Sequence, residues 1–326
     1  MKNIEIGTAR TSGAGRVTGW LDLADYPDGS PMRAPVVIVT GVNPGPTVWL
    51  HGCVHGNEYC GTHIIHELLR SVDPSEMSGR VVALPALNIT AFNAGIRMSP
   101  FEKYNGGDMN RNFPGDPRGS LTQQMANAIY SELKQHADYL VDFHTAHTPD
   151  VQWALYAALD GTVAETGERM AKAFGYHDTL ATPPDMLAGS AMMTAGSDGI
   201  PALIVEAGGK GPAFLKNNVE DAAERLRNVL RLLEILQGDV TDYGPIANFS
   251  GFDWVHASRG GLFIPAVACG DKIAASQVIG QYYDIFGAPS GTAESPREGT
   301  VLAIHPGPLM TNGETLVHIG HDPRKD

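Results

Sequence analysis

The chain is short of the residues that secreted, membrane and nucleic-acid-binding proteins use in quantity. It has three cysteines among 326 residues, at positions 53, 60 and 269, and this odd number implies no disulfide framework. Lys and Arg total 23 against 36 Asp and Glu, a formal net charge of −13. Nucleic acids and anionic membranes attract clustered Lys and Arg, so neither partner is expected. No window approaches eighteen uninterrupted apolar residues, so no membrane span is expected either.

The N-terminal stretch MKNIEIGTARTSGAG has no apolar segment typical of a signal peptide. On that basis we expect a cytoplasmic protein, in which the N-x-S/T sequons at Asn88 and Asn248 arise by chance. Hydrophobic residues make up 43% of the chain and charged residues 18%, as in ordinary globular proteins. The length favours two domains.

Short apolar runs bounded by Gly and Pro predict strands over residues 34–41, 46–52, 80–88, 139–144 and 201–209. Their near-continuous apolar character is typical of parallel strands that are covered on both faces. Helical spacing predicts helices over 58–70, 120–137 and 217–238, with Ser120 as an N-cap and Gly238 as a terminator. Strands that alternate with helices indicate an α/β sheet flanked by helices.

The pattern changes near residue 240. From Thr241 onward the sequence has no convincing helical period, and its short strand-like runs are separated by Gly and Pro. We therefore predict a catalytic domain over residues 1–240 and a smaller all-β domain over 241–326.

The segment TVWLHGCVHGNEYCGTHIIHELLR holds four of the twelve histidines. His55 and Glu58 form an H-x-x-E directly after an apolar strand, where open α/β sheets place their ligands. Catalytic zinc commonly takes two His and one Glu. A surface loop that leads into a helix would also explain the sequence HGNE at residues 55–58.

His63 and His66 are rival candidates three residues apart on the predicted helix. The H-E-x-x-H protease motif begins at His66 but fails, because Arg70 stands where its second histidine belongs. We expect both to be helix residues rather than ligands, and His51 and Cys53 to pack around the site.

The segment YLVDFHTAH offers a third ligand. His144 ends a buried strand, so its side chain is expected at the edge of the sheet. Asp142 points to the same side of that strand and could orient a metal-bound His144. His147, in the following loop, is the lesser candidate.

Two further segments carry polar groups. In GGDMNRNFPGD, Asn110 and Arg111 offer an amide and a planar guanidinium that suit a carboxylate, although a turn with an exposed Arg is the plainer explanation. In PALIVEAGG, Glu206 ends a strongly apolar run, where a carboxylate is costly to bury unless it is paired or catalytic. Such a position suits a general base.

Taken together, HGNE, DMNRNFPG, VDFH and IVEAGG resemble the succinylglutamate desuccinylase/aspartoacylase family of zinc carboxypeptidase-like hydrolases. The four motifs stand in the family's order over about residues 45–210. The resemblance implies a mixed sheet flanked by helices, followed by a β-rich C-terminal domain. It also implies hydrolysis of an N-acyl amino acid to a carboxylate and a free amino acid.

Position by position, the resemblance implies one Zn²⁺ held by His55, Glu58 and His144. It implies Glu206 as the general base, and Asn110 with Arg111 as the pair that binds the substrate carboxylate. A further arginine of the family, which polarises the scissile carbonyl, falls on Arg97. Arg97 lies farther from Arg111 than the family pattern leads us to expect, so Lys103 is a rival for this role.

The C-terminal segment is similar to lipoyl/biotinyl-type hairpins but lacks their modified lysine turn, so no covalent cofactor is expected. We expect this domain to shape the entrance to the site or to contribute to a homo-oligomer, for which a homodimer is the commonest form. Two alternatives remain open. One is a metallocarboxypeptidase for short peptides, and the other is a zinc-free binding protein on the same fold.

Overall fold

One long mixed sheet runs through the molecule. The computed structural model describes residues 3–103, 107–145, 151–159, 161–208, 216–305 and 307–324. Within these ranges the sheet has 12 strands. In spatial order they are β13 (Lys272–Ile273), β16 (Gly299–Ile304), β18 (Thr315–Pro323), β11 (Ala247–His256), β9 (Asp178–Thr182), β8 (Gln152–Ala157), β10 (Ala202–Ala207), β7 (Tyr139–His144), β5 (Asn43–His51), β6 (Ser78–Leu84), β4 (Pro31–Thr40) and β3 (Gly15–Asp25).

All five predicted strands are present, but one of them runs in an unexpected direction. β5 is parallel to β6 and β7, and β7 is parallel to β10. β4 is antiparallel to both of its neighbours, β3 and β6, so the expectation of a parallel strand over 34–41 was wrong. Val36 and Ile38 of this strand enter one core cluster and Val39 enters the other. Burial on both faces, and not strand direction, therefore produced the continuous apolar run.

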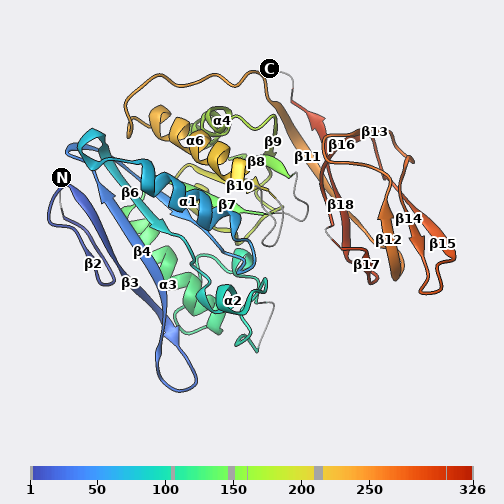
Figure 1. The fold of residues 1–326 in the computed structure, drawn as a ribbon, viewed down its shortest axis with the longest axis horizontal. Coiled ribbons are helices and arrows are strands. Elements are labelled where there is room, and N and C mark those ends of the chain that lie inside the picture. The colour runs from blue at the N-terminus through green and yellow to red at the C-terminus, as the bar shows by residue number, and fades with distance from the viewer. Residues whose placement is uncertain are drawn as a thin grey trace.

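Helices cover both faces of the sheet, as Figure 1 shows. One face is covered by α1 (Cys60–Ser71), α4 (Thr162–Phe174) and α6 (Lys216–Leu232), whose apolar residues share a core cluster. The other is covered by α3 (Leu121–His136) and α5 (Ala191–Ser197). Shorter elements are α2 (Ile89–Ala94) and the 3₁₀ turns η1 (Pro74–Glu76) and η2 (Met109–Arg111).

The predicted helix ends were right at Ser120 and wrong at Gly238. Ser120 caps α3, because its hydroxyl accepts the N–H of Gln123 and the Gln123 side chain accepts the N–H of Ser120. α6 ends at Leu232. Two residues later Glu234 takes a left-handed backbone (φ 59°), and the carbonyl of Ile235 then accepts the N–H of Ser78 at 2.9 Å. The chain thus leaves the helix early to pair with the start of β6.

The C-terminal segment forms strands, as expected, and extends the main sheet. β11 pairs in parallel with β9 and antiparallel with β18, so the catalytic strands and the C-terminal strands share one sheet. A separate antiparallel sheet packs beside them, with β15 (Pro289–Glu294), β14 (Val278–Tyr283), β12 (Gly261–Pro265) and β17 (Leu309–Met310) in that order. These strands lie at the right of Figure 1, away from the helices. The domain boundary at residue 240 and the likeness to lipoyl hairpins stay predictions.

Near the N-terminus a two-stranded ribbon, β1 (Glu5–Ile6) with β2 (Ala9–Arg10), packs beside β3. Within the described ranges, no helix is both long and apolar enough to cross a membrane.

Candidate metal centre and its pocket

A tight turn between β5 and α1 positions the first two candidate ligands. The N–H of Glu58 bonds to the carbonyl of His55 at 3.1 Å, which directs both side chains to the same side. Gly56 is required here, since a Cβ at this position would lie 2.0 Å from the carbonyl carbon of Ala91. The N–H of Gly56 also bonds to the carbonyl of Arg97 at 3.1 Å, which ties the turn to the loop that carries this arginine.

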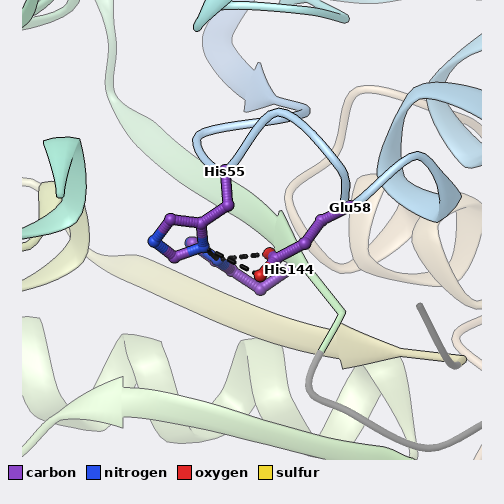
Figure 2. A group of neighbouring side chains, drawn as sticks. All are labelled: His55, Glu58 and His144. Atoms are coloured by element: carbon purple, nitrogen blue, oxygen red, sulfur yellow. Dashed lines mark hydrogen bonds and ion pairs between the residues drawn. The ribbon is translucent and has the colours of Figure 1, made fainter. Parts of the chain in front are cut away.

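His144 completes a buried group of three at the end of β7 (Figure 2). Its Nδ1 lies 3.0 Å from Oε2 of Glu58 and 3.2 Å from Nδ1 of His55. Nδ1 of His55 in turn lies 2.9 Å from Oε1 of Glu58. All three side chains are at most 3% exposed. Two imidazole nitrogens and a carboxylate therefore converge on one point.

Behind this group, each of the two histidines has its own carboxylate next to its Nε2 atom. Nε2 of His55 lies 3.0 Å from Oδ1 of Asp108, and Nε2 of His144 lies 3.3 Å from Oδ2 of Asp142. The structure thus places Asp142 where strand alternation led us to expect it. Asp108 was missed by the sequence analysis, although it stands two residues before Asn110 in a motif that the analysis quoted.

These charges hold one another in their ionised forms. Burial favours a neutral Glu58, but His55 and His144 outweigh it and keep the pKa of Glu58 well below its usual value. Burial favours a neutral His144, but Asp142 and Glu58 outweigh it and raise the pKa of His144 well above its usual value. Burial opposes the charge of Asp108 too, and His55 and Arg97 nevertheless lower its pKa.

The group fits a zinc ion by its chemistry and spacing. Two His and one Glu are a common donor set of catalytic zinc. Zn–N and Zn–O bonds of about 2.0–2.1 Å place tetrahedral ligand atoms about 3.3 Å apart, close to the 2.9–3.2 Å separations seen here. A carboxylate on the far nitrogen of each histidine fixes the tautomer that leaves Nδ1 facing the shared point. His55, Glu58 and His144 are thus able to hold a metal.

Asn110 and Arg111 lie in η2, next to this group. Nδ2 of Asn110 is 3.4 Å from Nε2 of His144, and its Oδ1 accepts the N–H of Ala191 at 3.2 Å. Arg111 is exposed, and its Nη1 donates to the carbonyl of Asn110 at 2.7 Å. Both side chains line the same pocket as the candidate metal ligands.

Arg97 lies within this pocket, and Lys103 is not among the residues that line it. The Arg97 guanidinium is 3.2 Å from Oε1 of Glu58 and 3.0 Å from Oδ2 of Asp108. Burial would lower the pKa of Arg97, but Glu58, Asp108 and Glu206 raise it. Lys103 is exposed. The geometry therefore favours Arg97 over Lys103 as the cation beside the candidate metal site.

β10 runs parallel to β7, and their register makes Glu206 and His144 Cα partners. Glu206 therefore lies beside His144 on the neighbouring strand. It is partly buried and lines the pocket. The alternative ligand His147 lies outside the described residues.

The remaining histidines of the first segment lie where they were expected. His63 and His66 are exposed on α1 and are not among the groups that could hold a metal in the described part of the chain. His51 is fully buried with Nδ1 3.8 Å from Oδ1 of Asp142, and burial lowers the pKa of His51 to about 4. Burial also raises the pKa of Cys53 to about 12, which makes it an inert packing residue.

The pocket has a volume of about 430 Å³ and draws on both parts of the chain. Besides the candidate metal ligands, Arg97, Asn110, Arg111 and Glu206, two sets of residues line it. One set is apolar, and the other comes from the C-terminal part of the chain. The apolar residues are Trp153, Leu155, Leu180, Met186, Leu187 and Ile204, and the C-terminal residues are Phe252, Trp254, His256, His305, Glu314, Thr315 and His318.

A buried His–Glu–His group that could hold a metal lies at the ends of the strands of a helix-flanked mixed sheet, and two arginines and a further glutamate line the same pocket. The family comparison shows which group of proteins shares this site. Residues 44–233 match the model of the succinylglutamate desuccinylase/aspartoacylase catalytic domain. The chain belongs to this family, which confirms the resemblance drawn from the sequence.

Relatives of the chain match over almost its whole length. It is 31% identical over 322 residues to the N-alpha-acetyl-L-2,4-diaminobutyric acid deacetylase of Halomonas elongata, covering 92% of this chain and 90% of that protein. It is similar to the product-bound structure of the ectoine utilization protein EutE (DoeB) from Ruegeria pomeroyi (TM-score 0.84, 27% identity, 94% of this chain and 95% of that one). It is also similar to a succinylglutamate desuccinylase/aspartoacylase from Rhodobacter sphaeroides (TM-score 0.83, 26% identity, 96% and 97%).

Proposed function

We propose that the protein is a zinc-dependent deacylase that hydrolyses the amide bond of an N-acyl amino acid. The observation that carries the proposal is the buried His55–Glu58–His144 group, with Arg97, Asn110, Arg111 and Glu206 in the same pocket. Family membership supports the reaction class. One zinc ion per chain would be held by His55, Glu58 and His144.

When bound, zinc would supply positive charge that polarises the scissile carbonyl and lowers the pKa of the attacking water. The other steps belong to side chains of the protein. Asn110 and Arg111 would bind the α-carboxylate, and this contact places the amide over the site. Arg97 would donate to the carbonyl oxygen as negative charge develops on it.

Glu206 would move the proton. It lies on the strand next to His144, and its side chain lines the pocket in which the amide would bind. Its carboxylate would take a proton as the water oxygen bonds to the carbonyl carbon, and would deliver that proton to the nitrogen as the C–N bond breaks. The products are a carboxylate and a free amino acid.

We further propose an acetyl group on a diamino acid as the substrate, because the relative that is 31% identical is named for removing acetyl from N-α-acetyl-2,4-diaminobutyrate.

The test is metal content together with release of free amine. The purified protein is expected to carry about one equivalent of zinc and to release amine from an N-acetyl amino acid, and a chelator is expected to stop the release. Full zinc with hydrolysis of short peptides instead of acyl amino acids would replace the proposal with a carboxypeptidase. Less than about one-tenth of an equivalent of metal, with no hydrolysis, would favour a binding protein.

A further inference from the structure

One side of the pocket comes from the C-terminal strands and has a chemistry different from that of the metal end. Trp254 and His256 lie on β11, His318 lies on β18, His305 follows β16 and Glu314 precedes β18. All five line the pocket that also contains the candidate metal ligands. We call these five residues the C-terminal wall.

Aromatic rings link this wall to the catalytic strands. The ring of Phe252 stacks on that of Trp153, with centroids 5.3 Å apart, and lies edge-on to His318 at the same distance. The ring of Trp254 is also part of this group, with its centroid 5.5 Å from that of Phe252 and 6.4 Å from that of His318. Trp153 is the Cα partner of Glu206 in the sheet. The aromatic group therefore begins one strand away from the proposed general base.

The arginines of the pocket lie at one end. Among the described residues that line it, the Lys and Arg side chains are Arg97 and Arg111, and both belong to the metal end. On the C-terminal wall the carboxylate is that of Glu314. Its Oε2 accepts the N–H of Thr311, and this bond lowers the pKa of Glu314, so this carboxylate is negatively charged at neutral pH.

Aromatic rings and a carboxylate that line one pocket favour a cation there. Trp254 is 37% exposed, so part of its ring surface is open to a ligand. A carboxylate at the same place would face Glu314 and aromatic rings.

We propose that the C-terminal wall is the subsite for a positively charged end of the amino-acid side chain, so that the protein prefers N-acyl amino acids whose side chain ends in an ammonium group. This rests on the proposed deacylase function and assigns the choice of amino acid to Glu314 and Trp254. Both act on specificity and are not catalytic residues.

The experiment compares three substrates that differ at the end of the side chain. These are N-α-acetyl-2,4-diaminobutyrate, which ends in an ammonium group, N-acetylnorvaline, which ends in a methyl group, and N-acetylglutamate, which ends in a carboxylate. Steady-state kcat and KM are measured for the wild type, Glu314→Gln and Trp254→Leu. Glu298→Gln is the matched control, because Glu298 lines a different cavity. Glutamine can still accept the Thr311 N–H, so the turn is retained.

The wild type is expected to have its lowest KM for the diaminobutyrate substrate. Glu314→Gln should raise that KM up to about five-fold with kcat unchanged, which is the upper range for an exposed charge pair. Trp254→Leu should raise it about two- to five-fold. Neither variant should change the KM for the norvaline substrate, and Glu298→Gln should change nothing. Added salt should weaken the wild-type preference.

Two results would overturn the inference while leaving the deacylase intact. One is efficient hydrolysis with no preference for the ammonium side chain, and the other is a preference for the glutamate side chain that Glu314→Gln does not alter. Failure to hydrolyse any of the three substrates with zinc bound would instead contradict the proposed function. Each outcome is distinct from the others.

Discussion

The two ends of the pocket are built on different physical principles. At the metal end, His55, Glu58 and His144 are buried, and each has charged partners at about 3 Å. At the C-terminal wall, the side chains of Trp254 and Glu314 are exposed.

This difference separates chemistry from selection. Buried groups with close partners keep their geometry and are little screened by water, as a reaction centre requires. Exposed groups are screened by water, so each adds little free energy, but this is enough to rank related substrates. Changes at the metal end should therefore reduce kcat or metal binding by large factors, and changes at the wall should alter KM by small factors.

The largest effect is expected from loss of a metal ligand. His144→Ala should leave less than about one-tenth of an equivalent of zinc and reduce hydrolysis to background, because two donors cannot hold a catalytic zinc tightly. Elemental analysis and amine release measure the two effects. His63→Ala is the matched control on α1 and should keep both metal and activity. Full zinc in His144→Ala would remove His144 from the ligand set.

Glu206→Ala should keep the fold and the metal but reduce kcat by about 10²–10⁴-fold, the usual contribution of a general acid–base group. Zinc content and steady-state rates are compared in the same preparation. A rate near that of the wild type would show that another group moves the proton.

Arg97→Met should reduce kcat by about 10²–10³-fold, because it removes one donor to the developing oxyanion. Lys103→Met is the matched comparison and should be close to the wild type, since Lys103 is exposed and outside the pocket lining. The reverse ranking of the two variants would give the carbonyl-polarising role to Lys103.

Asp142→Asn should weaken metal binding by about 10- to 100-fold, as is typical when the carboxylate behind a metal-bound histidine is changed. A competition titration with a chelator measures this affinity directly. Asp178→Asn is the control, because Asp178 lines a cavity different from the one that contains the metal ligands. An unchanged affinity would mean that Asp142 only fills space in the core. The smallest effects, on KM, are expected from the changes at Glu314 and Trp254.

The same comparison shows what could be predicted from the sequence. His55 and Glu58 lie three residues apart in one turn, and His144 ends an apolar strand, so local patterns marked them as candidates and the family resemblance joined them into one ligand set. Asp108 could have been found only by asking what orients His55, a contact that spans 53 residues.

A role of the C-terminal domain at the entrance was expected, but the residues of the C-terminal wall were beyond prediction, because they are brought together by strand pairing that no local pattern encodes. Trp254 pairs with His318 across β11 and β18, and Trp153 pairs with Glu206 across β8 and β10. The early end of α6 has a similar cause, since the segment after Leu232 pairs with the start of β6 instead of continuing a helix. Register between distant segments decides both features.

The most direct test of the central claim is hydrolysis of N-α-acetyl-2,4-diaminobutyrate by protein of known zinc content, before and after chelation and again after zinc is restored. We expect activity that follows the bound zinc up to about one equivalent per chain. Hydrolysis that persists at full rate in metal-free protein would contradict the assignment of His55, Glu58 and His144 as a catalytic metal site.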